Sequence, residues 1–556
     1  MSPSPPRPHE PPRTHGHRDA AAFDYDYVII GSGFGGSVSA LRLAEKGYSV
    51  AVLEMGKRWR TEDFPKTNWS LKKYFWRPAL GLHGIQQLTV LRDVFILHGA
   101  GVGGGSLVYA NTLLVPPDPV FQDPSWRHLG DWKQRLLPYY AVAKRMLGVV
   151  EAPNVMAADL VLKRVADEMG RGHTFHKATV GVYFGDGPGK KASDPFFGGE
   201  GPDRVGCTHC GACMVGCRVG AKNTLDKNYL YLAEKHGAVI VPERKVVDVR
   251  PLEGGGYAIT SERSTSRWKK DRQTLRARGV VFSAGVLGTV ELLMRCRDSG
   301  ALPNVSQKLG DFVRTNSEAL LGVSATKDLA NVDYSKGIAI TSGVYIDDKT
   351  HVEVVRFNEG SDVMAPLSTL LTPGGPPVPR WARWLGEIAK HPVLFARSVV
   401  PFGWAKRTAI LLVMQPIDNF LKLRMRKSRL DPSGSTLDSD AEGSTVPTYI
   451  PIANEFAQRM AKAIGGHAGS GTLEVLLNVA TTAHILGGCP MGTSAANGVI
   501  DDGCRVFGYD DMYVVDGSMI PANLGVNPSL TITAMAEYAM SRVPASAARS
   551  AQSRAA

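Results

Sequence analysis

The chain has 556 residues, of which 44% are hydrophobic and 21% are charged, and it carries a formal net charge of +12. This length exceeds what one hydrophobic core usually serves, so we expect at least two structural units. Lys and Arg are spread along the chain rather than gathered in one tract, which predicts a basic solvated surface and no nucleic-acid partner. No run of 18 uninterrupted apolar residues occurs, so we expect no membrane-spanning helix.

Both ends of the chain have the composition of disordered tails. Residues 1–22 are rich in Pro, Arg and His, and residues 544–556 consist mainly of Ala, Ser and Arg. Neither an apolar signal core nor a twin-arginine signal follows the start of the chain. We therefore expect a cytoplasmic protein and leave contact with a membrane surface open.

A strand, a glycine-rich turn, a helix and a second strand open the ordered part of the chain. The first strand covers 25–30, the turn places Gly31, Gly33 and Gly36 in the G-x-G-x-x-G pattern, and the second strand ends at Glu54. The glycines allow a tight turn, close approach of a pyrophosphate and packing of the helix, and Glu54 can accept hydrogen bonds from ribose hydroxyls. The pattern predicts a dinucleotide site, and its place at the start of a long chain favours FAD.

Five further motifs follow in order. A second glycine-rich stretch covers 98–111, and a strand, small-residue turn and helix cover 280–293. Near the end of the chain come 483–492, which begins Ala-His-Ile-Leu-Gly-Gly, then 512–521, and then 527–536, which begins Asn-Pro-Ser-Leu-Thr.

Taken together, these motifs resemble those of the glucose–methanol–choline (GMC) oxidoreductases. The resemblance extends from Asp24 to about Val543. Within that family the chain is most similar to the bacterial cholesterol oxidases that hold FAD without a covalent bond. The resemblance implies an α/β fold with a Rossmann-type FAD-binding domain built from 23–115, 221–310 and 480–543. A linking segment, 116–220, and a substrate-binding domain of sheet and helices, 311–479, complete the expected organisation.

The resemblance also implies roles for individual residues. His484 and Asn527 match the catalytic pair of the family. The ADP half of FAD would be held by Gly31, Gly33, Gly36 and Glu54, and adenine would contact the backbone of Val246. The pyrophosphate and flavin would be lined by Gly103, Gly104, Gly105, Ser106 and Asn111. The ribityl chain would lie at Asp516 and Gly517.

The implied reaction removes a hydride from an alcohol carbon and a proton from its oxygen, with flavin N5 as the hydride acceptor. His484 would help the proton leave, directly or through a water, and Asn527 would hydrogen-bond the substrate oxygen. Cholesterol oxidases of this type also isomerise the steroid double bond with a Glu in a strand shortly before a Pro. The nearest stretch, 410–416, reads Ile-Leu-Leu-Val-Met-Gln-Pro and has no acid, which argues against isomerase activity and weakens cholesterol as the substrate.

Four of the seven cysteines lie close together, at Cys207, Cys210, Cys213 and Cys217. Their C-x2-C-x2-C-x3-C spacing is that of bacterial ferredoxin loops, although the Pro that often follows is replaced by Arg218. Three interpretations stay open: a [4Fe–4S] cluster or a zinc ion, local disulfides, or plain buried thiols. A cluster near the flavin would direct electrons to a protein acceptor rather than to O2.

Residues 376–402 combine prolines, tryptophans at helical spacing and interleaved basic side chains. This pattern is typical of an amphipathic helix at a membrane interface, and a helix packed on the core fits it equally well. The expected function is oxidation of a sterol or similar bulky alcohol. The alternatives are a dehydrogenase for another lipophilic or long-chain alcohol that uses the cysteine cluster, and a flavin redox carrier or sensor without enzymatic activity.

Overall fold

The structure, a computed structural model, describes residues 23–546 except 267, 327–332, 429–433 and 442–445. Most of the two tails predicted to be disordered lies outside the described residues. The described start of the C-terminal tail is held to the body, because Ser546 donates from its backbone N–H to the Lys46 carbonyl at 3.0 Å. Within the described ranges, no helix is long and apolar enough to cross a membrane.

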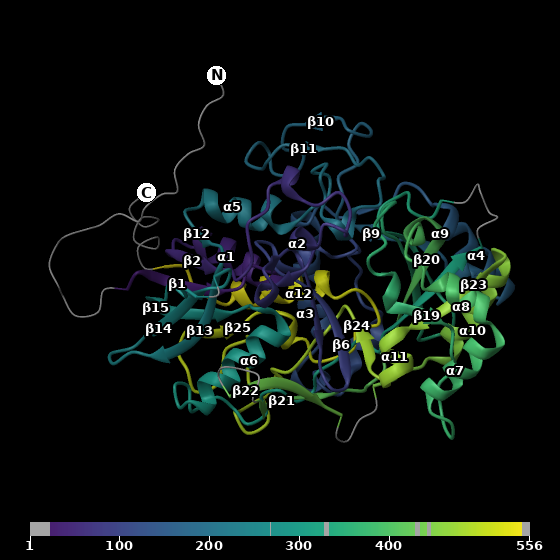
Figure 1. The fold of residues 1–556 in the computed structure, drawn as a ribbon. Coiled ribbons are helices and arrows are strands. Elements are labelled where there is room, and N and C mark those ends of the chain that lie inside the picture. The colour runs from purple at the N-terminus through teal and green to yellow at the C-terminus, as the bar shows by residue number, and fades with distance from the viewer. Residues whose placement is uncertain (1–22, 267, 327–332, 429–433, 442–445, 547–556) are drawn as a thin grey trace.

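One half of the molecule is built on a seven-stranded sheet in the order β12-β2-β1-β15-β14-β13, with β25 paired to β15 (Figure 1). Strand β1 lies parallel to β2 and β15, as expected for a dinucleotide fold. The strands are β12 (Val239–Val241), β2 (Val50–Leu53), β1 (Tyr25–Ile30), β15 (Gln273–Phe282), β14 (Tyr257–Arg263), β13 (Arg244–Pro251) and β25 (Met512–Val514). The run of β-branched, fully buried residues in β1 and β2 explains why these segments form central strands.

Helices cover this sheet and connect the two ends of the chain. Helix α1 (Phe34–Glu45) begins directly after the glycine-rich turn, and α12 (Ser529–Ser541) packs against it together with α5 (Tyr229–Lys235). Helix α3 (Trp132–Met146) packs on the other side of α12, and α6 (Gly285–Asp298) packs against β13. Residues from the start, middle and end of the chain therefore share one core.

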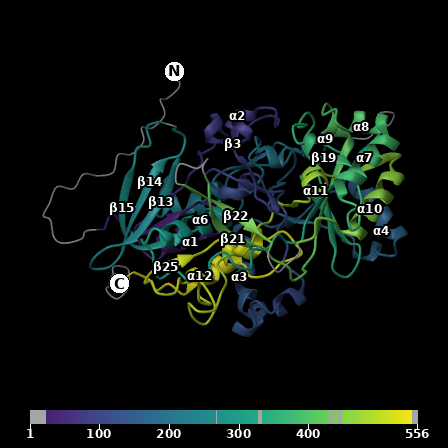
Figure 2. The same ribbon diagram turned by 60° about the horizontal axis from the view of Figure 1, so that its bottom comes forward.

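The other half is built on a second seven-stranded sheet, entirely antiparallel, in the order β19-β23-β16-β20-β18-β17-β8. Its strands are β19 (Ser368–Leu370), β23 (Gly466–Gly471), β16 (Ala319–Ala325), β20 (Thr408–Met414), β18 (His351–Val355), β17 (Ile340–Tyr345) and β8 (His176–Lys177). Figure 2 shows the same division from another side, with β13–β15 at one end and α7–α11 at the other.

The two faces of this second sheet are used differently. Helices α4 (Ala157–Glu168) and α10 (Pro451–Ala463) pack on one face, where they share a core with alternate strand residues such as Val352 and Val354. Because side chains alternate along a strand, His351, Glu353 and Val355 lie on the opposite face. Both α4 and β8 come from segment 116–220, so this segment contributes to the second sheet as well as linking the two halves.

A three-stranded sheet lies between the two halves (Figure 1). It has the order β24-β6-β5, with β24 (Ala480–Thr482) parallel to β6 (Val94–Gly99), and β5 (Gln86–Val90) antiparallel to β6. A hairpin of β21 (Lys422–Lys427) and β22 (Ser435–Asp440) flanks it. The short strand β24 matters most for the site, because the chain passes from it directly into the segment that carries His484.

Candidate functional site

A cavity of about 1340 Å³ extends between the two halves of the molecule. This volume is above the upper range of an ordinary small-molecule pocket, so it has room for a dinucleotide and a second molecule. The sequence-predicted residues that line it are Gly31, Gly33, Glu54, Gly104, Gly105, Val246, His484, Asp516, Gly517 and Asn527. On the other side, Leu320, Val355, Ile410 and Leu412 of the antiparallel sheet form an apolar wall.

The two glycine-rich turns meet at one end of this cavity. A Cβ added at Gly31 would lie 2.3 Å from the Ser283 carbonyl, and one at Gly104 would lie 2.7 Å from the Cα of Gly33. A Cβ at Gly36 would lie 2.1 Å from the Gly31 carbonyl, so this glycine packs α1 against its own turn. The space above Gly33 is open within 4 Å. Backbone amides and the N-terminus of α1 are thus accessible there, which fits the pyrophosphate of FAD.

Two buried carboxyl groups lie where the ribose and the ribityl chain of FAD are expected. Glu54 follows β2, and its oxygens accept hydrogen bonds from Ser32 at 2.7 Å and from the Gly56 and Gly101 amides at 2.7 and 3.3 Å. Asp516 follows β25 and accepts from the hydroxyls of Thr289 and Ser518, both at 2.5 Å. Burial raises the pKa of both carboxyl groups, and these hydrogen bonds oppose that rise.

Four predicted cofactor residues do not line the cavity: Gly36, Gly103, Ser106 and Asn111. The Ser106 hydroxyl donates to the Gly103 carbonyl at 2.6 Å and accepts from the Leu225 amide at 3.1 Å. Asn111 is fully buried in a left-handed conformation, and neither polar atom of its side chain has a hydrogen-bond partner. Ser106 and Gly103 thus stabilise the second glycine-rich turn without facing the cavity. The side-chain amide of Asn111 has hydrogen-bonding atoms without a partner.

His484 and Asn527 both line the cavity although 43 residues separate them. His484 lies just after β24, and Asn527 lies just before α12, where Pro528 precedes the first helical residue. Sequence analysis did not identify the partner of His484. The Nδ1 atom of His484 hydrogen-bonds to Oε1 of Glu318, a fully buried residue that immediately precedes β16. This contact leaves Nε2 as the ring nitrogen available to a substrate.

The resemblance implies an acid in the strand before Pro416, and the structure places a carboxyl beside Asn527 from a different strand. Residues 410–416 indeed have none, but the neighbouring strand β18 places Glu353 within reach of Asn527. The Nδ2 atom of Asn527 donates to Glu353 Oε2 at 3.1 Å, and both side chains are buried. Because an amide NH2 carries two donor hydrogens, the second remains available for a substrate oxygen. The carboxyl was missed because its contact with Asn527 depends on strand pairing and not on sequence spacing.

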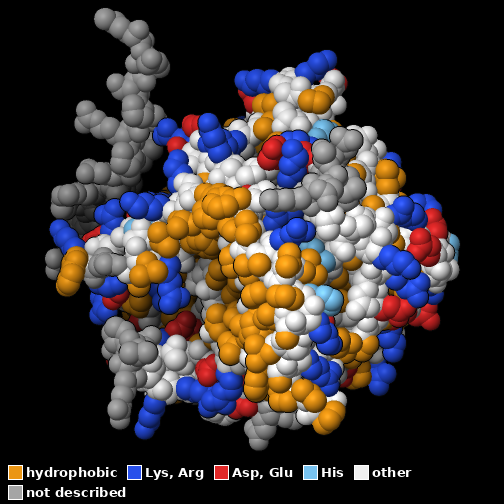
Figure 3. All heavy atoms as spheres, turned by 45° about the vertical axis from the view of Figure 1, so that its right-hand side comes forward, with side chains coloured by type: hydrophobic (Ala, Val, Ile, Leu, Met, Phe, Trp, Pro, Cys, Tyr) orange, Lys and Arg blue, Asp and Glu red, His pale blue; other side chains and the backbone are white. Residues whose placement is uncertain are grey.

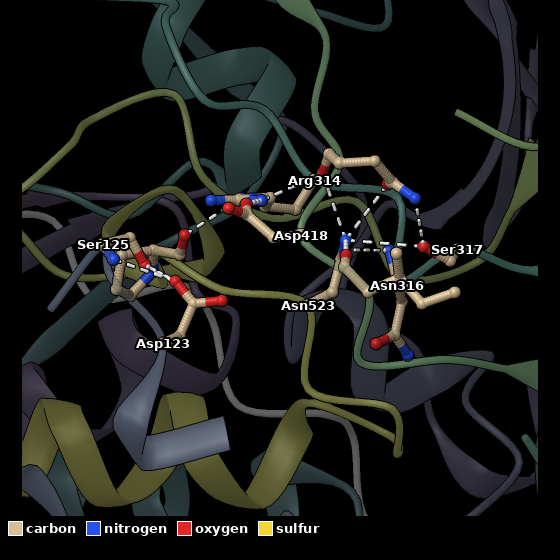
Figure 4. Close-up of polar contacts among 10 residues, drawn as sticks. Asp123, Ser125, Arg314, Asn316, Ser317, Asp418 and Asn523 are labelled. Atoms are coloured by element: carbon tan, nitrogen blue, oxygen red, sulfur yellow. Dashed lines mark hydrogen bonds and ion pairs between the residues drawn. The ribbon is translucent and has the colours of Figure 1, made fainter. Parts of the chain in front are cut away.

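The segment 314–318 belongs to a buried polar network that includes Asn523 (Figure 4). The backbone amide of Asn316 donates to Asn523 Oδ1 at 2.7 Å, and Asn316 Nδ2 donates to the Val526 carbonyl at 3.1 Å, directly before Asn527. Asn316 and Ser317 both have positive φ angles, 59° and 45°, which turn the chain sharply before Glu318. One turn therefore fixes the position of His484 through Glu318 and that of Asn527 through its own loop.

This network extends to the surface. Asn523 Nδ2 also donates to the carbonyls of Ile417 and Asn419 at 2.6 and 3.1 Å, and Arg314 forms an ion pair with Asp418 (Figure 4). The turn between β20 and β21 is thereby tied to the catalytic loops.

Burial acts in opposite directions on the pKa values of His484 and Glu353, although both are raised. Burial acts to lower the pKa of His484, but the negative charge and hydrogen bond of Glu318 outweigh it, and Glu353 adds to them, so the net shift is upward. Burial raises the pKa of Glu353 to about 7, against the hydrogen bond from Asn527 and the charge of His484. Glu353 therefore changes protonation close to neutral pH, as an acid–base group should, and His484 holds its proton more strongly than an ordinary histidine.

The cysteine loop does not form a metal centre in this structure. The four thiols are free, and burial raises the pKa of Cys207 to about 12 and also raises that of Cys213. They surround a space of only about 20 Å³. Among the described residues, no group of three or more His, Cys, Asp or Glu side chains is arranged to hold a metal ion. Of the three interpretations, the structure fits free thiols, two of them buried.

Comparison with known proteins adds independent information. Two family models described as GMC oxidoreductase match residues 201–313 and 454–536, and one described as an NAD(P)-binding Rossmann-like domain matches 29–72. Among solved structures, pyridoxine 4-oxidase from Mesorbium loti is 17% identical with a TM-score of 0.58, covering 93% of this chain and 99% of its own. The formate oxidase of Aspergillus oryzae RIB40 is 15% identical with a TM-score of 0.58, covering 94% and 98%. At such identities these two structures establish the fold alone.

Curated relatives are much more similar in sequence. A cholesterol oxidase of Acinetobacter baumannii is 50% identical over 94% of this chain and 95% of its own length. A cholesterol oxidase of Mycobacterium tuberculosis is 49% identical over 94% and 91%. A long-chain-alcohol oxidase of Arabidopsis thaliana is 24% identical over 93% of this chain and 67% of its own. The Rossmann-type half, the antiparallel substrate sheet and the identity of about 50% to curated relatives agree. The chain therefore belongs to the GMC oxidoreductase family, whose members are FAD-dependent enzymes.

Proposed function

We propose that this protein oxidises the hydroxyl group of a sterol, such as cholesterol, to a ketone. The observation that carries the proposal is the convergence of His484 and Asn527 on one cavity that also contains the cofactor turns and an apolar wall. Two relatives about 50% identical over 94% of the chain are cholesterol oxidases, which supports a sterol over a straight-chain alcohol. Retention of both catalytic side chains argues against a flavin carrier or sensor.

In the proposed oxidation, FAD supplies the acceptor for the hydride when it is bound. His484 Nε2 accepts the hydroxyl proton, because Nδ1 is engaged by Glu318. Glu318 stabilises the imidazolium that forms and fixes the orientation of the ring. The free Nδ2 hydrogen of Asn527 donates to the substrate oxygen and holds the carbinol carbon in position.

Glu353 supports a second step, isomerisation of the steroid double bond. It is a buried carboxyl with a pKa raised to about 7, held beside the catalytic amide at 3.1 Å. Such a carboxyl can take a proton from a carbon next to the new ketone and return it farther along the ring. The arrangement supports this activity, because β18 brings a carboxyl beside Asn527 although 410–416 has none.

For the electron acceptor we propose O2. Burial raises the pKa of the Cys207 and Cys213 thiols, and the four cysteines surround a space of about 20 Å³, which does not favour transfer through a cluster. Replacing Cys210 and Cys217 together by Ser should leave the rate of peroxide formation unchanged, as followed by a peroxidase-coupled assay. Loss of a visible band that is not due to flavin, together with loss of turnover, would restore the cluster alternative.

A basic, apolar surface supports delivery of the substrate from a lipid layer. Helix α7 (Arg380–Lys390) buries only Arg380, and α8 (Pro392–Ser398) buries no residue. Large apolar side chains on and around them are exposed: Val378, Trp381, Leu385, Val393, Val399, Val400, Phe402, Leu476 and Leu477. Figure 3 shows this side of the molecule crossed by a broad hydrophobic band with Lys and Arg at its margins. An apolar area of this kind on a soluble fold usually marks an interaction site.

Charge indicates which partner covers this surface. Between 376 and 407 there are six basic residues and one acidic residue, Glu387. Anionic lipid headgroups attract such a segment by about 1 kcal/mol per basic side chain near the surface. The same region also borders the cavity, because Trp404 and Leu473 belong to its lining. We therefore propose that α7 and α8 dock on an anionic membrane surface and that the sterol enters from there.

Sedimentation with vesicles tests the docking. Wild-type protein should sediment with vesicles of phosphatidylcholine and phosphatidylglycerol more than with phosphatidylcholine alone. Val393→Asp on α8 should reduce sedimentation severalfold, because it places a negative charge in the contact. Leu137→Asp, at an equally exposed position on α3, is the matched control and should sediment like wild type. Equal sedimentation of both variants would contradict the assigned surface.

Product analysis tests the reaction. Purified protein loaded with FAD should convert cholesterol to a conjugated ketone that absorbs in the ultraviolet, with one peroxide formed per ketone. A ketone without conjugation would support the oxidation and contradict the isomerisation. Turnover of a long-chain alcohol with no turnover of sterol would overturn the proposed substrate.

A further inference from the structure

A histidine next to Glu353 has no explanation in the reaction as described so far. His351 lies two residues before Glu353 on β18 and on the same face of the sheet. It is fully buried, and neither ring nitrogen has a hydrogen-bond partner. Glu353 Oε1, the oxygen not engaged by Asn527, is likewise buried without a partner. Buried polar atoms usually find partners, so unpaired atoms on adjacent acid–base groups require an account.

Three acid–base groups converge over Gly343, which has no side chain. Gly343 of β17 pairs with Glu353 on one side and with His176 of β8 on the other. A Cβ added at Gly343 would lie 2.5 Å from Nε2 of His351 and 3.1 Å from Nε2 of His176. Cross-strand partners have Cβ atoms about 5 Å apart, so Glu353 and His176 flank the same point. The absent Cβ leaves room for these groups to approach.

The imidazole rings of His351 and His176 stack on each other, so that His176 follows His351 in the row of groups that begins at Glu353. The rings of His351 and His176 stack at 5.3 Å with an interplanar angle of 14°, and Tyr345 stacks on His351 at 4.7 Å. His176 is half-buried, and its Nδ1 lies 3.0 Å from the Thr174 carbonyl. Because a carbonyl only accepts, Nδ1 carries the hydrogen in neutral His176, and Nε2 is free to accept a proton.

We propose that His351 and His176 form a proton relay that connects Glu353 with solvent. The relay rests on the proposed isomerisation, in which Glu353 takes a proton from a substrate carbon. The carboxyl proton passes to one nitrogen of His351 while the other nitrogen of that ring gives its proton, through a bridging water, to Nε2 of His176, which exchanges it with solvent. No electrons are transferred, and each proton that leaves is replaced by one from solvent when the path runs in reverse.

The relay fits the properties of the groups. A buried carboxyl with a pKa near 7 is partly protonated at neutral pH and must lose that proton before it can act as a base. Burial and the neighbouring His176 lower the pKa of His351 to about 3, so it conducts as a neutral ring that accepts at one nitrogen as it donates from the other. Any gap between Oε1 and the ring can be bridged by a buried water with polar partners on both sides.

Isomerisation in D2O tests the relay. The substrate is the unconjugated ketone, and the readout is deuterium in the conjugated product by mass spectrometry, with an enzyme-free incubation for background exchange. Wild-type protein should incorporate solvent deuterium. His351→Phe, which keeps a stacked ring, should reduce incorporation about tenfold while sterol-dependent flavin reduction is retained as evidence of folding. Gly343→Ala, which would displace the His351 ring, should act in the same direction.

The matched control is His467→Phe, a half-buried histidine at the other end of the same sheet on β23, and it should leave incorporation unchanged. Equal incorporation by wild type and His351→Phe would overturn the relay. Conjugated product without solvent deuterium in wild type would overturn the relay and leave the isomerisation standing. Absence of conjugated product altogether would overturn both.

Discussion

The two seven-stranded sheets carry function in different ways. In the Rossmann-type sheet the first glycine turn lies at a strand end and its glycines lie within a few residues of one another, from Gly31 to Gly36. In the antiparallel sheet the polar contacts of the candidate catalytic residues join distant positions: Glu318 meets His484 across 166 positions, and Glu353 meets Asn527 across 174. The first arrangement places a cofactor by local backbone geometry, whereas the second places acid–base groups by strand register and buried hydrogen bonds.

The largest effect expected from breaking this arrangement is at His484. His484→Ala removes the proton acceptor, so sterol-dependent flavin reduction should slow by about 100- to 10,000-fold. FAD absorbance should persist, because the cofactor turns are separate from this loop. A normal rate of anaerobic reduction would refute the role assigned to His484.

Glu353→Gln separates the two proposed steps. The amide keeps the shape of the side chain and removes the base, so isomerisation should fall by about 100- to 10,000-fold while oxidation continues. Chromatography should then show the unconjugated ketone accumulating. Equal loss of both steps would indicate that Glu353 serves the first reaction or the fold instead.

A Glu318→Gln variant tests the contact between Glu318 and His484 through the pH dependence of flavin reduction. The charge of Glu318 raises the pKa of His484, so its removal should lower that pKa. Neutral His484 is needed to accept the proton, and activity is lost as pH falls through its pKa. The acid limb of the rate profile for flavin reduction should therefore move to lower pH in the variant. An unmoved limb would show that His484 titration does not control the rate.

Asn523→Ala tests the support behind the catalytic loops. Loss of its buried hydrogen bonds to Asn316 and to the Ile417 and Asn419 carbonyls should reduce the free energy of unfolding by about 1–3 kcal/mol. Chemical denaturation of the holoenzyme measures this change. Asn497→Ala in an exposed turn provides the comparison and should cost less. Equal losses would show that the network around Asn523 adds no special stability.

Sequence alone predicts the parallel half well, because its signals are local. The strand at 25–30, the glycine turn and the helix after it are all confirmed, and the GMC resemblance is confirmed by relatives about 50% identical. The antiparallel half was predicted only in outline. Glu353 reaches Asn527 because β18 pairs with β20 and β17, and this register cannot be read from the order of residues along the chain.

The same limit explains the two other differences. The cysteine spacing matches a ferredoxin loop, but spacing does not determine where the thiols point, and the described residues do not assemble into a metal site. The amphipathic pattern near 380 predicts a helix, which α7 confirms, but only the structure reveals that neither α7 nor α8 packs its apolar side chains into a core.

Anaerobic mixing of the FAD-loaded protein with cholesterol tests the central claim most directly. The account predicts that the visible flavin absorbance bleaches in a single phase with wild-type protein and far more slowly with His484→Ala. Wild-type flavin that stays oxidised with cholesterol, while a long-chain alcohol bleaches it, would contradict the claim that this site oxidises a sterol.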